Sequence, residues 1–332
     1  MKPPFTLSPH MLRLCTEIAR SLGRLEGSHV AKAGPKLRKS NRVIQNHSQI
    51  IQNRVRTIQA SLAIEGNTLE LDKVTAMIEG KRVIGPQREI LEVQNAIRAY
   101  DQILSYNPHS AKSLREAHGV MMKGLVVDAG KWRSKNVGIF QGEKVAHAAP
   151  QAKRVPELMD RLFAFFKAEK ESHPLILSAV FHYELEFIHP FSDGNGRIGR
   201  LWQTTLLTRF HPLFEFTPIE SVIHHRQEAY YKSLGLADKA ADASPFIEFS
   251  LETILEALED LGVTIRPEPL TAGHRLEIAG ERFQERTFSR KDYLSIFKTI
   301  STATASRDLV QGVEDGLLVK TGEKALASYR FK

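Results

Sequence analysis

Residues 189–200 constrain the fold of this chain more than any other segment, because they end one helix and begin another within a short stretch. The segment reads His-Pro-Phe-Ser-Asp-Gly-Asn-Gly-Arg-Ile-Gly-Arg. Pro190 cannot continue the hydrogen bonding of a helix, and it disfavours helical geometry at the residue before it. The apolar segment 174–188 is therefore predicted to form a helix that ends where the chain reverses at His189.

The glycine-rich centre of this segment predicts an anion site. Asp193 is a good N-cap residue, and we expect the second helix to begin near Gly194 and to run to residue 207. The backbone N–H groups of Gly194, Asn195 and Gly196 would be free at the helix N-terminus, where the helix dipole also favours negative charge. Glycine also lets an anion approach the backbone closely.

Two arginines complete the predicted anion site. Arg197 and Arg200 are three residues apart, so they share a helix face. Each guanidinium group can donate two parallel hydrogen bonds to the oxygens of a phosphate. Residues 194–199 also fit the Gly-x-Gly-x-x-Gly fingerprint of dinucleotide-binding folds. That fingerprint requires a buried strand leading into its first glycine, whereas 174–188 is predicted to be helical, so we favour a phosphate site between two helices.

The segment 189–200 matches the Fic-family signature His-x-Phe-x-(Asp/Glu)-Gly-Asn-Gly-Arg-x-x-Arg at every fixed position, and the chain resembles that family over approximately residues 55–255. Fic proteins are mostly α-helical, and most characterised members transfer AMP from ATP to a Ser, Thr or Tyr hydroxyl of a protein. The resemblance therefore implies a protein adenylyltransferase that uses ATP and Mg²⁺. Its partner would be a target protein with an acceptor hydroxyl, or the chain itself.

The resemblance also implies roles for individual residues. His189 corresponds to the general base, and the ordinary pKa of histidine near 6.5 suits that task. Asp193 corresponds to the Mg²⁺ ligand, and Phe191 is expected to anchor the loop in the core. Tyr230 and Tyr231 lie in the region expected near the base of the nucleotide, although either could instead belong to the core. The implied nucleotide-binding residues are Gly194, Asn195, Gly196, Arg197, Arg200 and Tyr231.

A short hairpin is predicted over 136–146, where apolar residues flank a Gln-Gly-Glu turn. It stands where Fic proteins have the flap that pairs its main chain with the target peptide. The resemblance places Ile139 and Gly142 along the edge of this flap. The preceding Lys-Trp-Arg, residues 131–133, resembles the usual lead-in to the flap.

Residues 61–67 read Ser-Leu-Ala-Ile-Glu-Gly-Asn, which resembles the Fic inhibitory motif (Ser/Thr)-x-x-x-Glu-(Gly/Asn). Its position before the 189–200 segment indicates a class II Fic protein. The inhibitory residues would be Ser61, Glu65, Gly66 and Asn67, with Glu65 paired to Arg200 in the place of the γ-phosphate. Alone, the same residues would describe an ordinary helix C-terminus. In some relatives this glutamate helps to remove AMP from the target, so a de-AMPylase stays an alternative.

The chain as a whole predicts a mainly α-helical protein: a Fic-type helical domain with a small β-hairpin flap, followed by a C-terminal winged-helix domain. Apolar periodicity predicts helices over 10–26, 41–64, 88–104, 112–124, 155–169, 174–188, 226–235 and 245–260. We expect an N-terminal helical region over 1–110, a Fic core over 111–262, a linker with prolines and glycine over 263–273 and the last domain over 274–332.

The C-terminal domain is predicted from three helices, over 274–286, 290–299 and 305–315, and a hairpin that ends at Phe331. This order resembles a winged-helix domain, a fold that often binds DNA. The predicted DNA-facing residues are Ser306, Arg307, Gln311, Lys320, Lys324 and Arg330. Because the domain holds 11 basic and 8 acidic residues, we favour a protein contact or a homodimer over DNA. A DNA-binding regulator with a nucleotide-sensing Fic domain stays an alternative.

Length and composition fit a globular protein. With 332 residues, 42% hydrophobic and 25% charged, the chain can form one large domain and a small one. Cys15 is its one cysteine, which excludes an intramolecular disulfide and a cysteine-rich zinc site. We see no signal peptide and no apolar run of membrane-spanning length, so we expect a cytoplasmic protein without membrane contact.

The net charge of +8 is concentrated near the N-terminus. The first 60 residues hold eleven lysines and arginines, against two acids, Glu17 and Glu26. Such a stretch indicates either an acidic partner, such as nucleic acid, or a solvated basic face. We favour the solvated face.

Overall fold

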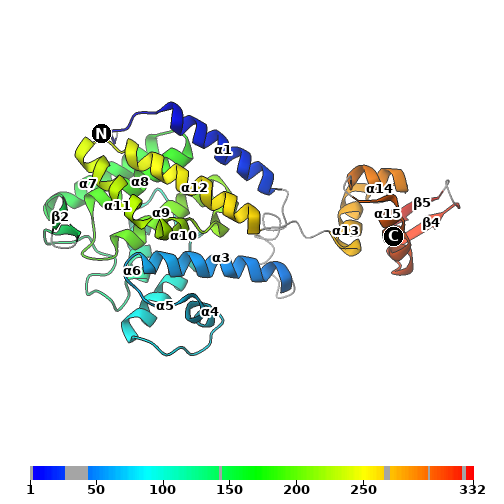
Figure 1. Cartoon of the computed structure of the whole chain (residues 1–332), viewed down its shortest axis with the longest axis horizontal. Helices are drawn as coiled ribbons and strands as arrows, with labels where there is room; N and C mark the ends of the chain where they lie inside the picture. Colours follow the sequence, from blue (N-terminus) through cyan, green and yellow to red (C-terminus); the bar gives the residue numbers. More distant parts are fainter. Residues whose placement is uncertain (1–2, 27–43, 142–143, 265–269, 298–299, 324–326) are drawn as a thin grey trace. The chain divides into compact units, whose positions relative to one another are not determined.

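The structure is a computed structural model that describes residues 3–26, 44–141, 144–264, 270–297, 300–323 and 327–332. The chain forms two compact units, residues 1–265 and 266–332, and each has a hydrophobic core of its own (Figure 1). The basic stretch between residues 27 and 43 lies outside the described residues. Among those described, no helix has the length and apolar character needed to cross a membrane.

The first unit consists of helices and one short hairpin (Figure 1). Its α-helices are α1 (Pro9–Glu26), α3 (Ile44–Ala63), α4 (Leu71–Ile78), α5 (Gln87–Asp101), α6 (Ala111–Met121), α7 (Val155–Ala168), α8 (Pro174–Ile188), α9 (Asn195–Phe210), α10 (Ile219–His225), α11 (Gln227–Ala240) and α12 (Ser244–Thr264). Two 3-10 turns are η1 (Ala152–Arg154) and η2 (Pro212–Phe216). The predicted hairpin is the antiparallel pair β1 (Gly138–Gln141) and β2 (Lys144–Ala148). The prediction of a mainly α-helical fold is confirmed.

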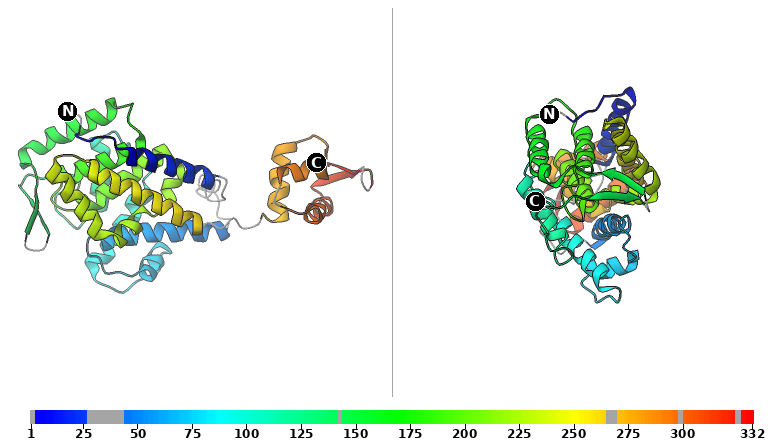
Figure 2. Two further views of the ribbon diagram at one scale, coloured as in Figure 1. Left: turned by 45° about the horizontal axis from the view of Figure 1, so that its top comes forward. Right: turned by 90° about the vertical axis from the view of Figure 1, so that its left-hand side faces the viewer.

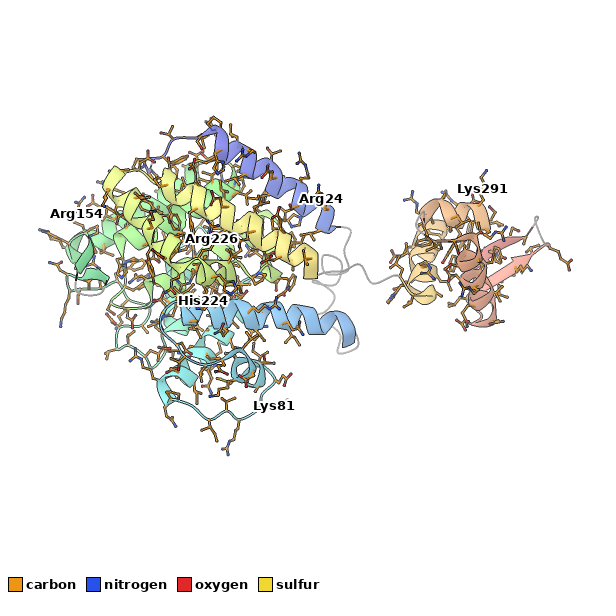
Figure 3. All side chains as sticks on the ribbon, in the orientation of Figure 1. Arg24, Lys81, Arg154, His224, Arg226 and Lys291 are labelled. Carbon is orange, nitrogen blue, oxygen red and sulfur yellow. The ribbon has the colours of Figure 1, made fainter. Side chains whose placement is uncertain are left out.

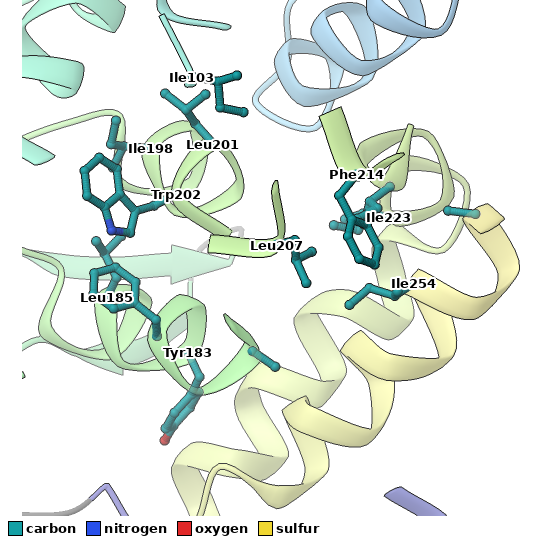
Figure 4. Close-up of a cluster of buried hydrophobic side chains, with 14 of the residues drawn as sticks. Ile103, Tyr183, Leu185, Ile198, Leu201, Trp202, Leu207, Phe214, Ile223 and Ile254 are labelled. Carbon is teal, nitrogen blue, oxygen red and sulfur yellow. The ribbon is translucent and has the colours of Figure 1, made fainter. Parts of the chain in front are cut away.

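The helices α8 and α9 form the centre of this unit. They pack against each other, and ten of the 15 residues of α8 and twelve of the 16 residues of α9 are buried. Figure 4 shows part of this core, with Leu185 of α8 and Trp202 and Leu207 of α9 among its members. Burying a side chain of this size stabilises the fold by roughly 1.5–3 kcal/mol, so the turn between the two helices has a rigid base.

The N-terminal helices share the same core. In Figures 1 and 2, α1 lies along α12, and α4 and α5 lie together on one side of α3. Buried residues from Met11 in α1 to Leu261 in α12 form one cluster. The regions expected over 1–110 and 111–262 therefore make a single compact unit.

The start of α11 is attached to α12 by a surface arginine. Arg226 is labelled in Figure 3. Its guanidinium lies 3.0 Å from Glu252 and 3.3 Å from Glu256. It also lies over the ring of Phe249, 5.1 Å from its centroid. Exposed ion pairs and cation–π contacts each contribute about 0.2–1 kcal/mol, so these contacts only reinforce the apolar packing between α11 and α12.

Two features of the first unit differ from expectation. The short helices α4 and α10 were not predicted; they have 8 and 7 residues, too few for a helical apolar pattern to stand out. The prediction that Asp193 caps the second helix is wrong. Gly194 takes the N-cap position of α9 with φ of 83°, so Asp193 lies one residue too early, and its carboxylate accepts the N–H of Gly194 instead.

The second unit contains three helices and a small sheet. Its elements are α13 (Ala272–Phe283), β3 (Phe288–Ser289), α14 (Arg290–Ile296), α15 (Thr302–Glu314), β4 (Leu318–Thr321) and β5 (Ser328–Phe331). The strands are antiparallel in the order β3-β5-β4. The guanidinium of Arg275 pairs with the buried carboxylate of Asp308, which also accepts the hydroxyl of Tyr293. Both ends of the linker expected over 263–273 are helical, and Lys324 lies outside the described residues.

Candidate active site

His189 lies at the C-terminal end of α8, where the chain turns back. Its φ of 49° is in the left-handed region, which a residue with a side chain adopts only when its surroundings hold it there. Its N–H donates to the carbonyl of Leu185 at 2.9 Å, and its Nδ1 lies 3.3 Å from the carbonyl of Glu186. This second contact favours the tautomer with its proton on Nδ1, so Nε2 is the basic nitrogen.

Arg133 holds the turn that carries His189. Its side chain is almost completely buried, and its guanidinium donates to four carbonyl oxygens, those of Lys135, Pro150, Ile188 and His189. Lys135 and Pro150 flank the β1–β2 hairpin on either side. One buried side chain therefore joins the base of the hairpin to the turn at His189.

His118 of α6 supports the same turn from another side. Its ring stacks on the buried ring of Phe191, with centroids 3.6 Å apart. Its Nδ1 accepts the N–H of Gly130 at 2.9 Å, so its Nε2 carries the proton and donates to the carbonyl of Asp193 at 2.9 Å. Burial lowers the pKa of His118 to about 4, and the neutral ring is the form that makes both bonds. Phe191 is the core anchor that the sequence predicts.

Asn195 closes the loop between the two helices. Its side chain accepts the N–H of Phe191 and donates to the carbonyl of Phe191, both at 2.9 Å. This side chain is buried, and both its oxygen and its nitrogen bond to the loop, so the backbone N–H is the group of Asn195 best suited to bind an anion. A Cβ atom on Gly194 would come 2.6 Å from the sulfur of Met122, so glycine is required there for space as well as for its φ.

The carboxylate of Glu65 lies against the first turn of α9. A Cβ atom on Gly196 would come 2.3 Å from Oε1 of Glu65 and 3.1 Å from Nη1 of Arg200. Gly196 therefore leaves the space that this carboxylate occupies. The N–H groups of the first helical turn and the dipole of α9 favour an anion near this end of the helix, and in this structure the carboxylate of Glu65 lies there.

Arg200 is buried and bonded to the 61–67 segment. Its Nη2 lies 2.8 Å from Glu65 Oε1 and 2.8 Å from the carbonyl of Ser61, and its Nε donates to Ser61 Oγ at 3.2 Å. Burial, the largest single effect, lowers the pKa of Arg200, but Glu65, Tyr230 and Glu186 together raise this pKa overall. Its Nη1 is buried without a hydrogen-bond partner in the part of the chain that the structure describes. Arg200 thus has a donor left for another oxygen.

Arg197 is bonded to two acids. Its Nη2 lies 2.9 Å from Asp193 Oδ1, and its Nη1 lies 3.4 Å from Oε1 of Glu92 on α5. The other oxygen of Glu92 accepts the side-chain amide of Asn67 at 2.8 Å. The 61–67 segment therefore contacts Arg200 directly and is connected to Arg197 through Glu92.

The end of α3 fixes the position of Glu65. Gly66 has φ of 89°, and the N–H of Asn67 donates to the carbonyl of Leu62 at 3.1 Å, which is the pattern of a glycine C-cap. Gln227 of α11 donates to the carbonyl of Ile64 at 3.1 Å. Of the predicted residues of the 61–67 segment, Ser61 and Glu65 thus contact Arg200, whereas Asn67 contacts Glu92.

Asp193 is the predicted metal ligand, and its carboxylate fits a Mg²⁺ ion held together with phosphates. The side chain is 42% exposed and lies 2.9 Å from Arg197 and 3.7 Å from Arg88. Mg²⁺ on a nucleotide needs only one or two protein carboxylates, because phosphates and water complete its shell. Among the described residues there is no group of three or more His, Cys, Asp or Glu placed to hold a metal ion by themselves.

The two tyrosines predicted near the nucleotide base differ in burial, and the hairpin is described only in part. Tyr230 is buried and its hydroxyl lies 3.1 Å from Nε2 of His182, so it belongs to the core. Tyr231 is 38% exposed, and the charge of Glu65 contributes, after burial, to the raised pKa of its hydroxyl. Ile139 lies on β1 opposite His147, whereas Gly142 lies outside the described residues.

Sequence reasoning missed the residues that support the site from a distance. Glu92 contacts Arg197 across 105 positions, and His118 contacts Asp193 across 75. Arg133 was noted only as part of the lead-in to the hairpin, with no contact predicted for it. Such pairs leave no local pattern. The one signal in the sequence that could have indicated such a contact is the position of His118 on the apolar face of its helix.

Comparisons with known proteins identify the family. The chain matches the model of the Fic/DOC family over residues 108–207, a range that contains the whole 189–200 segment. A Fic family protein from Desulfovibrio desulfuricans G20 has a crystal structure that is similar over 100% of this chain and 98% of that one, with 38% identity and a TM-score of 0.73. This chain belongs to the Fic family. Fic-1 (residues 134–508) from C. elegans shares the fold, with a TM-score of 0.61 at 22% identity over 76% of this chain and 72% of that one.

Two further relatives of this Fic protein are named protein adenylyltransferase Fic. The one from Culex quinquefasciatus is 30% identical over 271 residues, which are 76% of this chain and 51% of the relative. The one from Nematostella vectensis is 29% identical over 206 residues, 58% and 45% of the two chains. This Fic protein thus spans about half the length of these curated relatives.

Proposed function

We propose that this Fic protein transfers AMP from ATP to a Ser, Thr or Tyr hydroxyl of a target protein or of the chain itself. The observation that carries the proposal is the short turn from His189 to Gly196, which joins a histidine to the N-terminus of the helix that holds Arg197 and Arg200. The names of the relatives from Culex and Nematostella support the same activity.

The residues divide the reaction between them. His189 would take the proton of the acceptor hydroxyl on Nε2 while the hydroxyl oxygen bonds to the α-phosphorus. The bond from that phosphorus to the β-phosphate breaks, and pyrophosphate leaves. The backbone N–H groups of α9 would bind phosphate oxygens, and Arg197 and Arg200 would balance the charge that develops. Mg²⁺ held by Asp193 would supply charge neutralisation on the α- and β-phosphates.

The hairpin would bind the target. β1 pairs with β2 on one side, and an extended target peptide could add to the flap as a further strand. Ile139 and Gly142 would lie along that edge. Because Arg133 joins the ends of the hairpin to the turn at His189, a bound peptide would be positioned relative to the base.

We further propose that Glu65 inhibits the enzyme, in the manner of class II Fic proteins. Its carboxylate occupies the space left by Gly196 and bonds to Arg200, so a γ-phosphate would have to displace it. Glu92 competes in the same way for Arg197. Release of the 61–67 segment would free the guanidinium group of Arg200 for the nucleotide, while a phosphate would still have to compete with Glu92 and Asp193 for Arg197.

The chemistry is tested with the Glu65→Gly protein, Mg²⁺ and ATP labelled at either the α- or the γ-phosphate, with and without cell lysate. We expect label on protein from α-labelled ATP, none from γ-labelled ATP, and none from either in Glu65→Gly/His189→Ala. Label from the γ-phosphate would indicate phosphoryl transfer instead. Bound ATP without any label, together with loss of AMP from a pre-modified target, would identify a de-AMPylase.

The second unit is proposed to be a winged-helix domain, on the order of its helices and strands. Two of its predicted DNA-facing side chains are engaged locally: Gln311 donates to Asp315, and Ser306 accepts from Arg290. We therefore favour a contact with protein or with a second copy of the chain. Salt-dependent DNA binding without transfer activity would support the regulator alternative instead.

A further inference from the structure

Glu186 lies beside His189 and has no part in the reaction proposed above. It stands one turn earlier on α8, and its Oε2 is 3.9 Å from Nδ1 of His189. Its side chain is 12% exposed. Its Oε1 is buried and has no hydrogen-bond partner within the described part of the chain. Burying a carboxyl group in this way costs free energy, so its placement calls for an explanation other than hydrogen bonding.

Space for this carboxyl group comes from α9. A Cβ atom on Gly199 would lie 2.8 Å from Oε1 of Glu186 and 3.1 Å from the ring of His182. Both ring nitrogens of His182 have other hydrogen-bond partners: Nδ1 bonds to Gln203 at 2.7 Å and Nε2 to Tyr230 at 3.1 Å. Burial lowers the pKa of His182 to about 3. His182 is therefore neutral, and His189 is the imidazole whose charge Glu186 can affect.

The charge on Glu186 depends on the groups around it. The titratable and charged groups that face it are His182 and His189 on α8, Arg200 on α9, Tyr230 and Tyr231 on α11, and Glu65 after α3. Burial, and next the negative charge of Glu65, raise the pKa of Glu186 to about 8, while Arg200 acts in the opposite direction. With Glu65 in place the carboxyl group is protonated at neutral pH, and departure of Glu65 favours its ionised form.

We propose that Glu186 is a positioning residue that acts through His189: once Glu65 has left, its carboxylate stabilises the imidazolium that forms when Nε2 of His189 accepts a proton. The inference deepens the proposed function and rests on it for its catalytic meaning. It also gives Glu65 a second effect. In the inhibited protein Glu65 blocks the anion site and, by favouring the uncharged form of Glu186, makes His189 a weaker base.

The test is a pH titration of His189 by NMR, in full-length Glu65→Gly protein with isotope-labelled histidine and no nucleotide. The His189 signal is assigned by its loss in His189→Ala. Glu186→Gln should lower the pKa of His189 by about one unit, the smaller of the shifts typical for an opposite charge at this distance. Glu184→Gln is the matched control: burial raises the pKa of Glu184 to about 7, but residues two positions from Glu186 face another side of the helix.

An unchanged titration of His189 in Glu186→Gln would overturn the proposal. So would equal shifts in the Glu186→Gln and Glu184→Gln proteins, because they would indicate a general field rather than this carboxylate. In the transfer assay, Glu186→Gln should move the acidic limb of the rate profile to lower pH by the same amount. If no variant transfers label while Glu186→Gln still shifts His189, the adenylyltransferase proposal fails and the pairing of Glu186 with His189 stands.

Discussion

At the scale of single residues, the site depends on side chains that hold its backbone as much as on those that would touch a substrate. Arg133, His118 and Asn195 bond to backbone groups of the turn that carries His189. Buried polar groups must keep their partners, so these bonds maintain His189 in its left-handed conformation.

Replacing Arg133 by lysine should lower the free energy of unfolding by about 2 kcal/mol, because one ammonium group cannot reach four carbonyl oxygens and a buried polar group without its partner costs 1–3 kcal/mol. The rate of AMP transfer by the Glu65→Gly protein should also fall when Arg133 is replaced by lysine. Denaturant unfolding measures the first effect, with the exposed Arg154→Lys as the control. A loss no greater than that of the control would contradict the role assigned to Arg133.

Acid should destabilise the protein through His118. Its pKa is about 4 in the folded protein and near 6.5 when unfolded, so the unfolded chain takes up the proton first. Stability that is present above about pH 6.5 is then lost as the pH falls toward 4. Between pH 7 and pH 5, the free energy of unfolding of His118→Gln should fall by about 2 kcal/mol less than that of the parent. Parallel pH profiles of the two proteins in denaturant unfolding would argue against this assignment.

Glu92 should reduce the affinity for ATP even while Glu65 is in place. Glu92→Gln keeps an oxygen for Asn67 but removes the charge that competes with phosphate for Arg197. We expect ATP to bind about fivefold more tightly, which is the lower end of couplings between linked sites. Calorimetric titration with MgATP measures this, and weaker binding in the variant would show that Glu92 supports the site rather than competing for it.

At the scale of elements, the important unit is the C-terminal end of α3, because it presents Glu65 to the start of α9. Its geometry relies on Gly66, whose φ of 89° other residues adopt at a cost. Among the described residues, no atom beyond the glycine and its chain neighbours lies within 4 Å of a Cβ placed there, so a side chain at this position would strain the backbone without a clash.

Gly66→Ala should therefore loosen the end of α3 by about 1 kcal/mol and raise the basal transfer rate by up to about fivefold, the factor that this free energy allows. Gly235→Ala in α11 is the control, since it too has open space around its Cβ position but no positive φ. A rate that stays at the parent value in Gly66→Ala would mean that the position of Glu65 does not depend on this cap.

The sequence alone predicted the longer helices and the hairpin, and it drew attention to the 189–200 and 61–67 segments. Each of these features depends on residues that are close together in the sequence. The sequence did not predict α4 and α10, which are too short to show a period, or the cap of α9, which depends on the backbone of Gly194. It also missed Glu92 and His118, since a contact across many positions arises only when the helices pack.

At the scale of the whole molecule, the segment proposed to inhibit and the candidate active site belong to one compact unit with a common core. Glu65 and Arg200 are 135 positions apart, yet Glu65 directly follows α3 and Arg200 lies on α9, and the same core holds both helices in place. The proposed inhibition would therefore require no second domain, and the unit from residue 266 onward has its own core. Under this proposal, a signal that relieves inhibition would only have to move the end of α3 away from α9.

The most direct test is the initial rate of AMP transfer by the full chain as purified, compared with Glu65→Gly. We expect Glu65→Gly to be faster by on the order of tenfold or more, a coupling of the size found between linked sites. Glu70→Gly, which alters an exposed glutamate at the start of α4, should match the parent, and Glu65→Gly/Arg200→Ala should lose the gain. Equal rates in the parent and Glu65→Gly would contradict the claim that Glu65 occupies the place of the phosphate.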